Sequence, residues 1–182
     1  MFGLKDCTSQ SASPERETLN HKLDDSQRSA VDFAESQNEF CMIDGPPGTG
    51  KTTVLVEIIA REVRKGGKVL FCAPSNMAVD NMTERLVRSG EAVVRVGHPA
   101  RVTEGCRHQT LEYRLRPQYD LVRDIEARVR ALKRHNGNTD LKQRFEREKR
   151  KLDHQISQCL EEANVVLGTL ITCGEGSYHY TK

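Results

Sequence analysis

The chain has 182 residues, of which 36% are hydrophobic, 30% charged and 5% aromatic, with no Trp. This length suits one domain with a modest core, and it leaves much of the surface to charged helices or unstructured segments. The apolar runs are far shorter than the ~20 residues of a membrane-spanning helix. No signal-like segment opens the chain and the 6 cysteines show no CxxC pairing. Composition therefore argues against a secreted disulfide-stabilised module or a membrane protein, and favours a soluble intracellular protein of the cytoplasm or nucleus.

The formal net charge is only +2, but the charge is unevenly spread. From Arg101 to His154 the sequence holds 15 Lys and Arg against 9 Asp and Glu, so the remainder is mildly acidic. A basic segment of this kind suggests a polyanion as partner. A solvated helix face explains such a charge run equally well.

The amino-terminal region divides into two parts. Residues 1–22 mix Ser, Thr, Gln and charges without periodicity, which is typical of a flexible leader. From Leu23 to about Ser36 an apolar side emerges, and Ser26 can cap a short helix there. Gln27 falls in the first turn of that helix.

The central motif is GPPGTGKT, from Gly45 to Thr52, which follows the apolar run 40–43 and precedes a helical pattern. We expect a buried strand, a glycine-rich turn and a helix opening at Lys51, an arrangement in which backbone N–H groups converge on phosphates. Lys51 would reach the β and γ phosphates, and the Thr52 hydroxyl would bind Mg²⁺. A chance match is the alternative, and the flanking strand and helix patterns disfavour it. The sequence predicts a nucleoside triphosphate site.

The other residues of this loop have distinct roles. Gly45, Gly48 and Gly50 let the backbone adopt positive φ and approach phosphate oxygens. Pro46 and Pro47 stiffen the loop, so that less entropy is lost on binding.

A strand and helix alternation follows the loop. The helix that starts at Lys51 is expected to run to about Lys65 and to end at Gly66-Gly67, before a buried strand over 68–73. A turn at Pro74-Ser75-Asn76 leads into a helix over 76–89, and a further strand covers 92–96. Because ligands gather at the carboxyl ends of parallel strands, Ser75 and Asn76 are expected beside the phosphate loop. Simple capping of the helix by either residue is the alternative.

The alternation then stops, and two helical stripes appear. The first comprises Leu121, Val122, Ile125, Val129 and Leu132, and the second comprises Leu141, Phe145, Leu152, Ile156, Leu160 and Ala163. A turn over 136–140 separates them, which predicts a charged helical hairpin inserted between strands. The pattern NVVLGTL over 164–170 returns to a buried strand, and it places Thr169 on the same rim as Ser75 and Asn76.

Four segments together resemble a known family. LDDSQRSAV (23–31), GPPGTGKTT (45–53), APSNMAVDNM (73–82) and NVVLGT (164–169) are similar, in order and spacing, to the Q-motif, motif I, motif Ia and the following nucleic-acid-contacting motif of superfamily-one helicases. They are most like the branch that contains the nonsense-mediated-decay RNA helicase. VRVGHPAR (94–101) is particularly similar to the immunoglobulin mu-binding type within that branch.

The resemblance implies specific roles. Gln27 would read the adenine edge of ATP, using the donor and acceptor of its amide. The segment from Gly45 to Thr53, which includes Thr49, would bind ATP and Mg²⁺. Single-stranded RNA or DNA would contact Pro74, Ser75, Asn76 and Thr169. The family couples ATP binding and hydrolysis to movement along the strand with five-prime-to-three-prime polarity.

The resemblance also fixes the expected architecture. It implies an α/β, RecA-like P-loop NTPase fold with a parallel sheet, helices on both faces and an inserted helical hairpin. The expected divisions are a leader (1–22), a nucleotide-binding part (23–100), a helical insertion (101–163) and a return strand with tail (164–182). Neither RNA nor DNA is favoured as the strand, because backbone contacts serve both.

Two departures from the family pattern shape the functional expectation. Leu23-Asp24 stands where the family generally has Leu-Asn. No apolar strand ending in Asp-Glu follows Thr169, and Glu175 lies in a turn-like stretch. We therefore expect an incomplete domain with an uncovered sheet edge, which binds ATP weakly and does not unwind nucleic acid unaided. The alternative to a helicase motor is a catalytically incomplete module that only binds nucleotide or nucleic acid.

Overall fold

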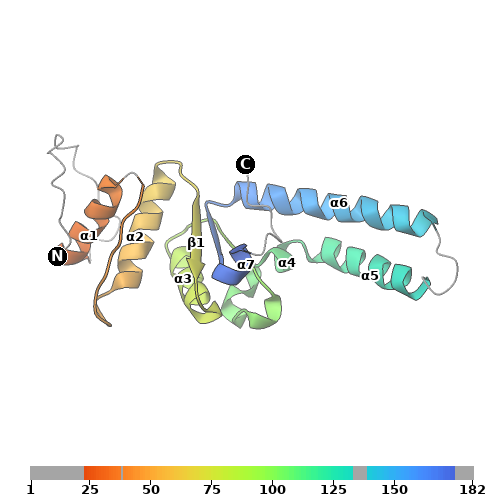
Figure 1. The fold of residues 1–182 in the computed structure, drawn as a ribbon, viewed down its shortest axis with the longest axis horizontal. Helices are drawn as coiled ribbons and strands as arrows, with labels where there is room; N and C mark the ends of the chain where they lie inside the picture. Colours follow the sequence, from red (N-terminus) through yellow and green to blue (C-terminus); the bar gives the residue numbers. More distant parts are fainter. Residues whose placement is uncertain (1–22, 38, 133–138, 175–182) are drawn as a thin grey trace.

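A computed structural model describes residues 23–37, 39–132 and 139–174 (Figure 1). The predictions for the leader (1–22), for the centre of the hairpin turn (136–138) and for Glu175 lie outside these residues. The elements in chain order are α1 (Asp25–Ser36), α2 (Lys51–Arg64), β1 (Val69–Ala73), α3 (Asn76–Arg88), β2 (Val93–Arg95), η1 (Pro99–Arg101), η2 (Glu104–Gln109), α4 (Leu111–Arg114), α5 (Arg116–Leu132), α6 (Thr139–Glu162), β3 (Val165–Thr169) and α7 (Leu170–Gly174).

The three described strands form one parallel sheet in the order β1-β3-β2. The returning strand β3 thus lies between the two strands that precede the hairpin. Ala73 pairs with Thr169 in the register of β1 and β3, so the carboxyl ends of these strands are level. This confirms the prediction that the Pro74-Ser75-Asn76 turn and Thr169 share one rim of the sheet.

Helices cover both faces of the sheet, as predicted. On one face, Ile59 of α2 and the α3 side chains pack against the inward residues of the strands, in a cluster of Ile59, Ala73, Val79, Met82, Leu86, Val93, Val165 and Leu167. On the other face, Val94 packs with Leu111 of α4 and with the end of α6 around Ala163. Successive strand residues such as Val93 and Val94 therefore face opposite sides, as strand geometry requires.

The predicted strand over 40–43 is wrong. Residues 40–46 have no regular secondary structure, and Phe40 and Met42 are 77% and 76% exposed. A strand exists only by pairing, and none of the three described strands pairs with this segment. Ile43 instead packs against the cluster formed by α1 and α2.

The helix α1 forms where predicted, but Ser26 does not cap it. Asp24 is the N-cap: its carboxylate accepts from the Gln27 N–H at 2.8 Å, and Gln27 Oε1 accepts from the Asp24 N–H at 3.2 Å. This reciprocal capping box satisfies two orphan N–H groups, which explains why Asp24 prevails over Ser26 two residues later. Asp24, the residue that departs from the family pattern, is thus an effective N-cap for α1.

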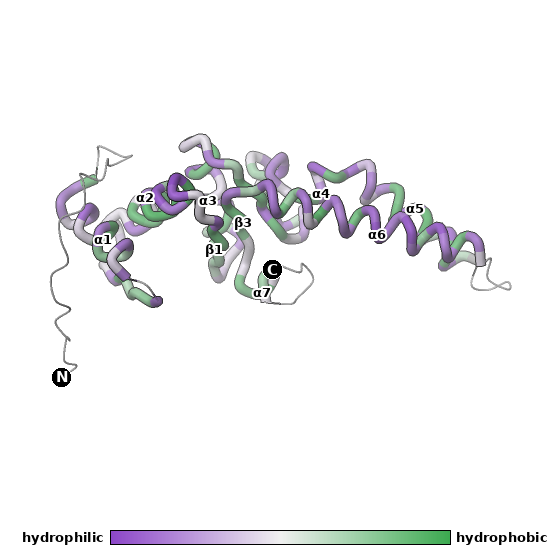
Figure 2. Tube along the Cα trace, turned by 90° about the horizontal axis from the view of Figure 1, so that it is seen from above, coloured by the Kyte–Doolittle hydropathy of each residue, from purple (hydrophilic) through white to green (hydrophobic). Residues whose placement is uncertain are grey.

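The helical hairpin is confirmed: α5 and α6 pack along each other and project from the sheet (Figure 1). Figure 2 shows short hydrophobic patches along otherwise hydrophilic helices, and the buried Ile125 and Leu152 belong to the predicted stripes. Gln118 Nε2 also donates to Glu148 Oε2 across the pair at 3.3 Å. The short helix α7 was not predicted, and it follows Thr169 directly.

Candidate nucleotide and nucleic-acid sites

The glycine loop ends at an open helix N-terminus. Gly50 is the N-cap of α2 with φ of 78°, a left-handed conformation that glycine adopts without a steric penalty, and no side chain caps this end. Gly48 is likewise left-handed. Backbone N–H groups in the first turn and the positive end of the helix dipole therefore suit an anion.

Lys51 bends back over this loop. Its ammonium donates to the Pro46 carbonyl at 2.9 Å and to the Gly45 carbonyl. The side chain is exposed, and Thr52 follows it in the same turn. A cation beside an uncapped helix N-terminus, with a hydroxyl next to it, fits a phosphate chain and its Mg²⁺. The chemistry of the residues present is therefore that of a triphosphate site.

Gln27 lies directly against the same loop. Its Nε2 donates to the Thr49 carbonyl at 3.2 Å, although 22 residues separate the two in sequence. A Cβ on Gly50 would fall 2.5 Å from this nitrogen, so a larger residue there would displace the Gln27 amide and would also strain the left-handed backbone. The structure thus brings the Q-motif glutamine and the phosphate loop together.

The carboxyl ends of β1 and β3 open onto a cleft of about 680 Å³. Pro74, Asn76 and Thr169 line it, as the strand-contact prediction requires. Ser75 caps α3, because its hydroxyl accepts from the Ala78 N–H at 3.2 Å. The capping offered as the alternative is thus present at Ser75, and contact of Ser75 with a nucleic-acid strand stays a prediction. Thr169 also accepts from the Thr172 N–H at 3.2 Å, at the start of α7.

Sequence reasoning missed several residues of this cleft. His98 and Arg101 come from the segment after β2, Tyr119 comes from α5, and all three line the cavity. Arg101 adds a positive charge and Tyr119 an aromatic ring, the side-chain types that phosphates and bases contact. Two sequence signals marked His98 and Arg101: they follow a predicted strand, and they belong to VRVGHPAR (94–101), a segment that resembles the helicase branch.

A buried arginine fixes one wall of the cleft. Arg95, fully buried in β2, donates from Nε to Asp80 Oδ1 at 3.2 Å and from Nη2 to Asn76 Oδ1 at 2.7 Å. The second Asp80 oxygen accepts from the Thr103 N–H at 2.8 Å. Because Asn76 Oδ1 accepts from the buried Arg95, the N–H donors of the Asn76 amide are left to bind a ligand in the cleft. A charged residue within the apolar run VVRV was the signal that could have revealed this cluster.

A second ionic cluster joins α1 to α2, and no sequence pattern indicated it. Arg61 Nη1 lies 3.0 Å from Glu35 and 3.1 Å from Asp32, while its Nε donates to Glu57 at 2.9 Å. Burial raises the pKa of the Glu35 carboxyl, but hydrogen bonds and positive charge from Lys65 and Arg61 more than offset this. The pKa of Glu35 therefore lies below its ordinary value, and the carboxylate is charged at neutral pH.

A glycine loop at a helix N-terminus, followed by a parallel sheet with a cleft at its strand ends, is consistent with a P-loop NTPase-like domain. Comparison with known proteins agrees: the AAA domain family matches residues 22–140. The chain belongs to this family. The resemblance to superfamily-one helicases of the Upf1-like branch is thereby confirmed for this region.

Relatives in several organisms support this assignment. DNA-binding protein SMUBP-2 of Mus musculus is 43% identical over 163 residues, which cover 82% of this chain and 16% of that protein. DNA polymerase alpha-associated DNA helicase A of Schizosaccharomyces pombe is 43% identical over 109 residues, covering 59% of this chain and 16% of that protein. A regulator of nonsense transcripts 1 homolog of Drosophila melanogaster is 35% identical over 168 residues, covering 88% and 14%.

The chain spans about 16% of the length of the first of these relatives. Similarity over this region alone therefore does not establish for this chain the activity of the whole relatives. Among the described helices, none combines the length and apolar character needed to cross a bilayer.

Proposed function

We propose that this chain is the ATP-binding portion of an ATP-dependent nucleic-acid helicase. ATP with Mg²⁺ would bind at the loop from Gly45 to Thr53, with Lys51 and Thr52 on the phosphates and metal and Gln27 on the adenine. The observation that carries this proposal is the Lys51 ammonium beside the uncapped N-terminus of α2. Within the whole protein, ATP binding and hydrolysis would drive movement along a strand with five-prime-to-three-prime polarity, in the cytoplasm or nucleus.

The strand would follow the rim formed by Pro74, Asn76 and Thr169. The phosphate loop and the carboxyl end of β1 lie on the same side of the molecule, because α2 and β1 run in opposite directions (Figure 1). Arg101 and the donors of Asn76 suit the phosphates of a single strand, and Tyr119 suits a base. RNA and DNA both present these groups, and the names of the relatives include both DNA helicases and a regulator of transcripts.

Equilibrium titration with ATP and Mg²⁺ tests the nucleotide site. We expect saturable binding by the unmodified chain, and Lys51→Ala should weaken it at least about tenfold because a charge-assisted contact to phosphate is lost. Lys149→Ala, which removes an exposed lysine from α6, is the control and should bind as the unmodified chain does. Absence of saturable binding, or binding that survives Lys51→Ala, would refute the site.

Steady-state hydrolysis of ATP, with and without a single strand, separates the motor from a module that only binds. Hydrolysis requires stabilised charge on the γ phosphate beyond a loop lysine, and an arginine finger alone contributes ~10³ to 10⁵ in rate. We propose that the 182-residue chain by itself binds ATP without multiple turnover. Strand-stimulated turnover by the purified chain, absent in Lys51→Ala, would contradict this.

A further inference from the structure

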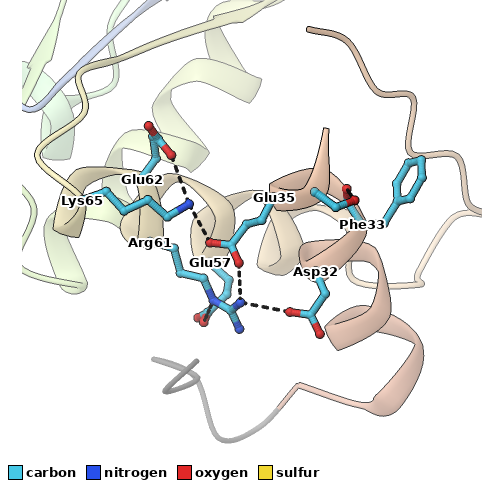
Figure 3. Close-up of polar contacts among 8 residues, drawn as sticks. Asp32, Phe33, Glu35, Glu57, Arg61, Glu62 and Lys65 are labelled. Atoms are coloured by element: carbon cyan, nitrogen blue, oxygen red, sulfur yellow. Dashed lines mark hydrogen bonds and ion pairs between the residues drawn. The ribbon is translucent and has the colours of Figure 1, made fainter. Parts of the chain in front are cut away.

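The interface of α1 and α2 ends in a cluster of five charged side chains, Asp32, Glu35, Glu57, Arg61 and Lys65, here called the α1–α2 ion cluster (Figure 3). Arg61 bridges the helices: it bonds Asp32 and Glu35 on α1 and Glu57 on its own helix. Lys65 adds a second bridge, with its Nζ 3.0 Å from Glu35 Oε1. Three ion pairs therefore cross between the helices.

The centre of the cluster is removed from water, whereas the outer members Asp32 and Lys65 are 60% and 52% exposed. The side chains of Glu57, Glu35 and Arg61 are 2%, 5% and 7% exposed. Buried ion pairs require closely defined geometry, because each charge loses its hydration and a displaced partner leaves it uncompensated. The α1–α2 ion cluster therefore allows only a narrow range of positions for α1 along α2.

The opposite end of α1 carries Gln27. Eight residues separate Gln27 from Glu35, which is about 12 Å along a helix. The main helix contact of α1 is with α2, through an apolar cluster that includes Leu23, Val31 and Val54. Apolar contacts are non-directional, whereas ionic hydrogen bonds fix distance and angle. The Gln27 amide accepts from the Asp24 N–H and donates to the Thr49 carbonyl, and the ion cluster adds to these bonds by setting where α1, and with it Gln27, lies along α2.

We infer that Asp32 and Glu35 are positioning residues for the nucleotide base: through Arg61 they set the register of α1 and so hold Gln27 where an adenine edge would lie. This inference rests on the proposed ATP site and deepens it. The phosphate contacts come from the loop and from α2, which holds Arg61 but does not depend on α1 for its own start. Loss of the cross-helix pairs should therefore weaken recognition of the base and spare recognition of the triphosphate.

The test compares ATP, GTP and inorganic tripolyphosphate, each with Mg²⁺, as ligands of the full chain. The double variant Asp32→Asn/Glu35→Gln keeps side-chain size and leaves α2 unchanged. We expect its Kd for ATP to rise about fivefold toward that for GTP, the effect of one misplaced hydrogen-bonding group. Its Kd for tripolyphosphate should stay within about twofold. Asp25→Asn, which removes a fully exposed carboxylate of the same helix, is the matched control and should alter none of the three.

Each other outcome has a defined meaning. An unchanged ratio of ATP to GTP affinity, or equal losses for ATP and tripolyphosphate, would overturn the positioning role. If circular dichroism shows that the double variant does not fold, Lys65→Met removes only the outer bridge and should still raise the Kd for ATP about twofold. Failure of the unmodified chain to bind tripolyphosphate or ATP would instead refute the nucleotide site itself, and the inference with it.

Discussion

Arg95 shows how one buried charge serves both stability and the candidate site. It is fully buried in the strand β2, yet its guanidinium has partners in Asp80, Asn76 and the Val96 carbonyl. Removing one member of such a cluster is costly because the other charge stays buried and uncompensated. Pairs at the surface contribute far less, since water screens both charges.

Arg95→Met should therefore lower the free energy of unfolding by about 3–5 kcal/mol, because Asp80 keeps its buried charge without the guanidinium. Urea unfolding monitored by circular dichroism measures the change. Arg88→Met is the matched control, since Arg88 forms an exposed pair with Glu84 at 3.3 Å, and it should cost about 0.5 kcal/mol or less. Similar losses for the two variants would mean that the Arg95 cluster does not behave as a buried pair.

At the scale of elements, the helices that begin or end at strong local signals could be predicted from sequence. α2 starts at Lys51 after a glycine and ends before Gly66, and α3 starts after Ser75, as their sequence patterns indicated. A glycine or serine at a helix end acts on backbone groups within one helical turn, so the helix end can be predicted from residues that are close in sequence. The N-cap of α1 was misassigned to Ser26, because Asp24 and Ser26 lie two residues apart and both side chains can cap a helix.

The failures concern interactions between distant segments. The run 40–43 has the composition of a strand, but pairing decides strand formation and is not encoded within four residues. The same reason applies to the site: the phosphate loop was visible as a motif, whereas the partners of Arg61 and Arg95 lie on other elements. The fold class, the hairpin and the loop were thus predictable, and the ionic clusters that position Gln27 and Asn76 were not.

The contribution of the α1–α2 interface to stability should depend on pH. The pKa of Glu35 is below its ordinary value of 4.5, so its ion pairs contribute fully above that pH and are lost as the pH falls through the folded-state pKa. Glu35→Gln should therefore be less stable than the unmodified chain near neutral pH, by about 1–2 kcal/mol for a partly buried pair. The difference should shrink as the pH falls below the ordinary value of 4.5 and through the lower pKa of the folded state. Urea unfolding at a series of pH values measures it, and a difference independent of pH would contradict the assignment.

For the molecule as a whole, β1 is an edge strand of the described sheet. It pairs with β3 on one side, and Leu70 is 50% exposed there. Unpaired N–H and C=O groups beside exposed apolar side chains favour pairing with another chain. The uncovered edge expected from the sequence lay beside the strand predicted over 40–43, which does not form, so the exposed edge of β1 is a different one.

We predict concentration-dependent self-association through this edge. Leu70→Lys should reduce it, because a charge on an edge strand opposes pairing between chains. Sedimentation velocity over a range of concentrations measures the effect. Val87→Lys, which places the same charge at a similarly exposed position on α3, is the control and should associate as the unmodified chain does. A monomer at all concentrations, or equal effects of both lysines, would exclude the β1 edge as the contact.

The connection between α6 and β3 has a mechanical consequence. Only Ala163 and Asn164 lie between them, and the last turns of α6 pack on the sheet. With 24 residues, α6 is a rigid arm of about 36 Å, so that tilting its base by about 5° would swing its far end by about 3 Å. A small reorientation of β3, the strand that carries Thr169, is therefore magnified at the distal end of the arm. The position of the distal end of α6 would therefore report small changes in the orientation of β3.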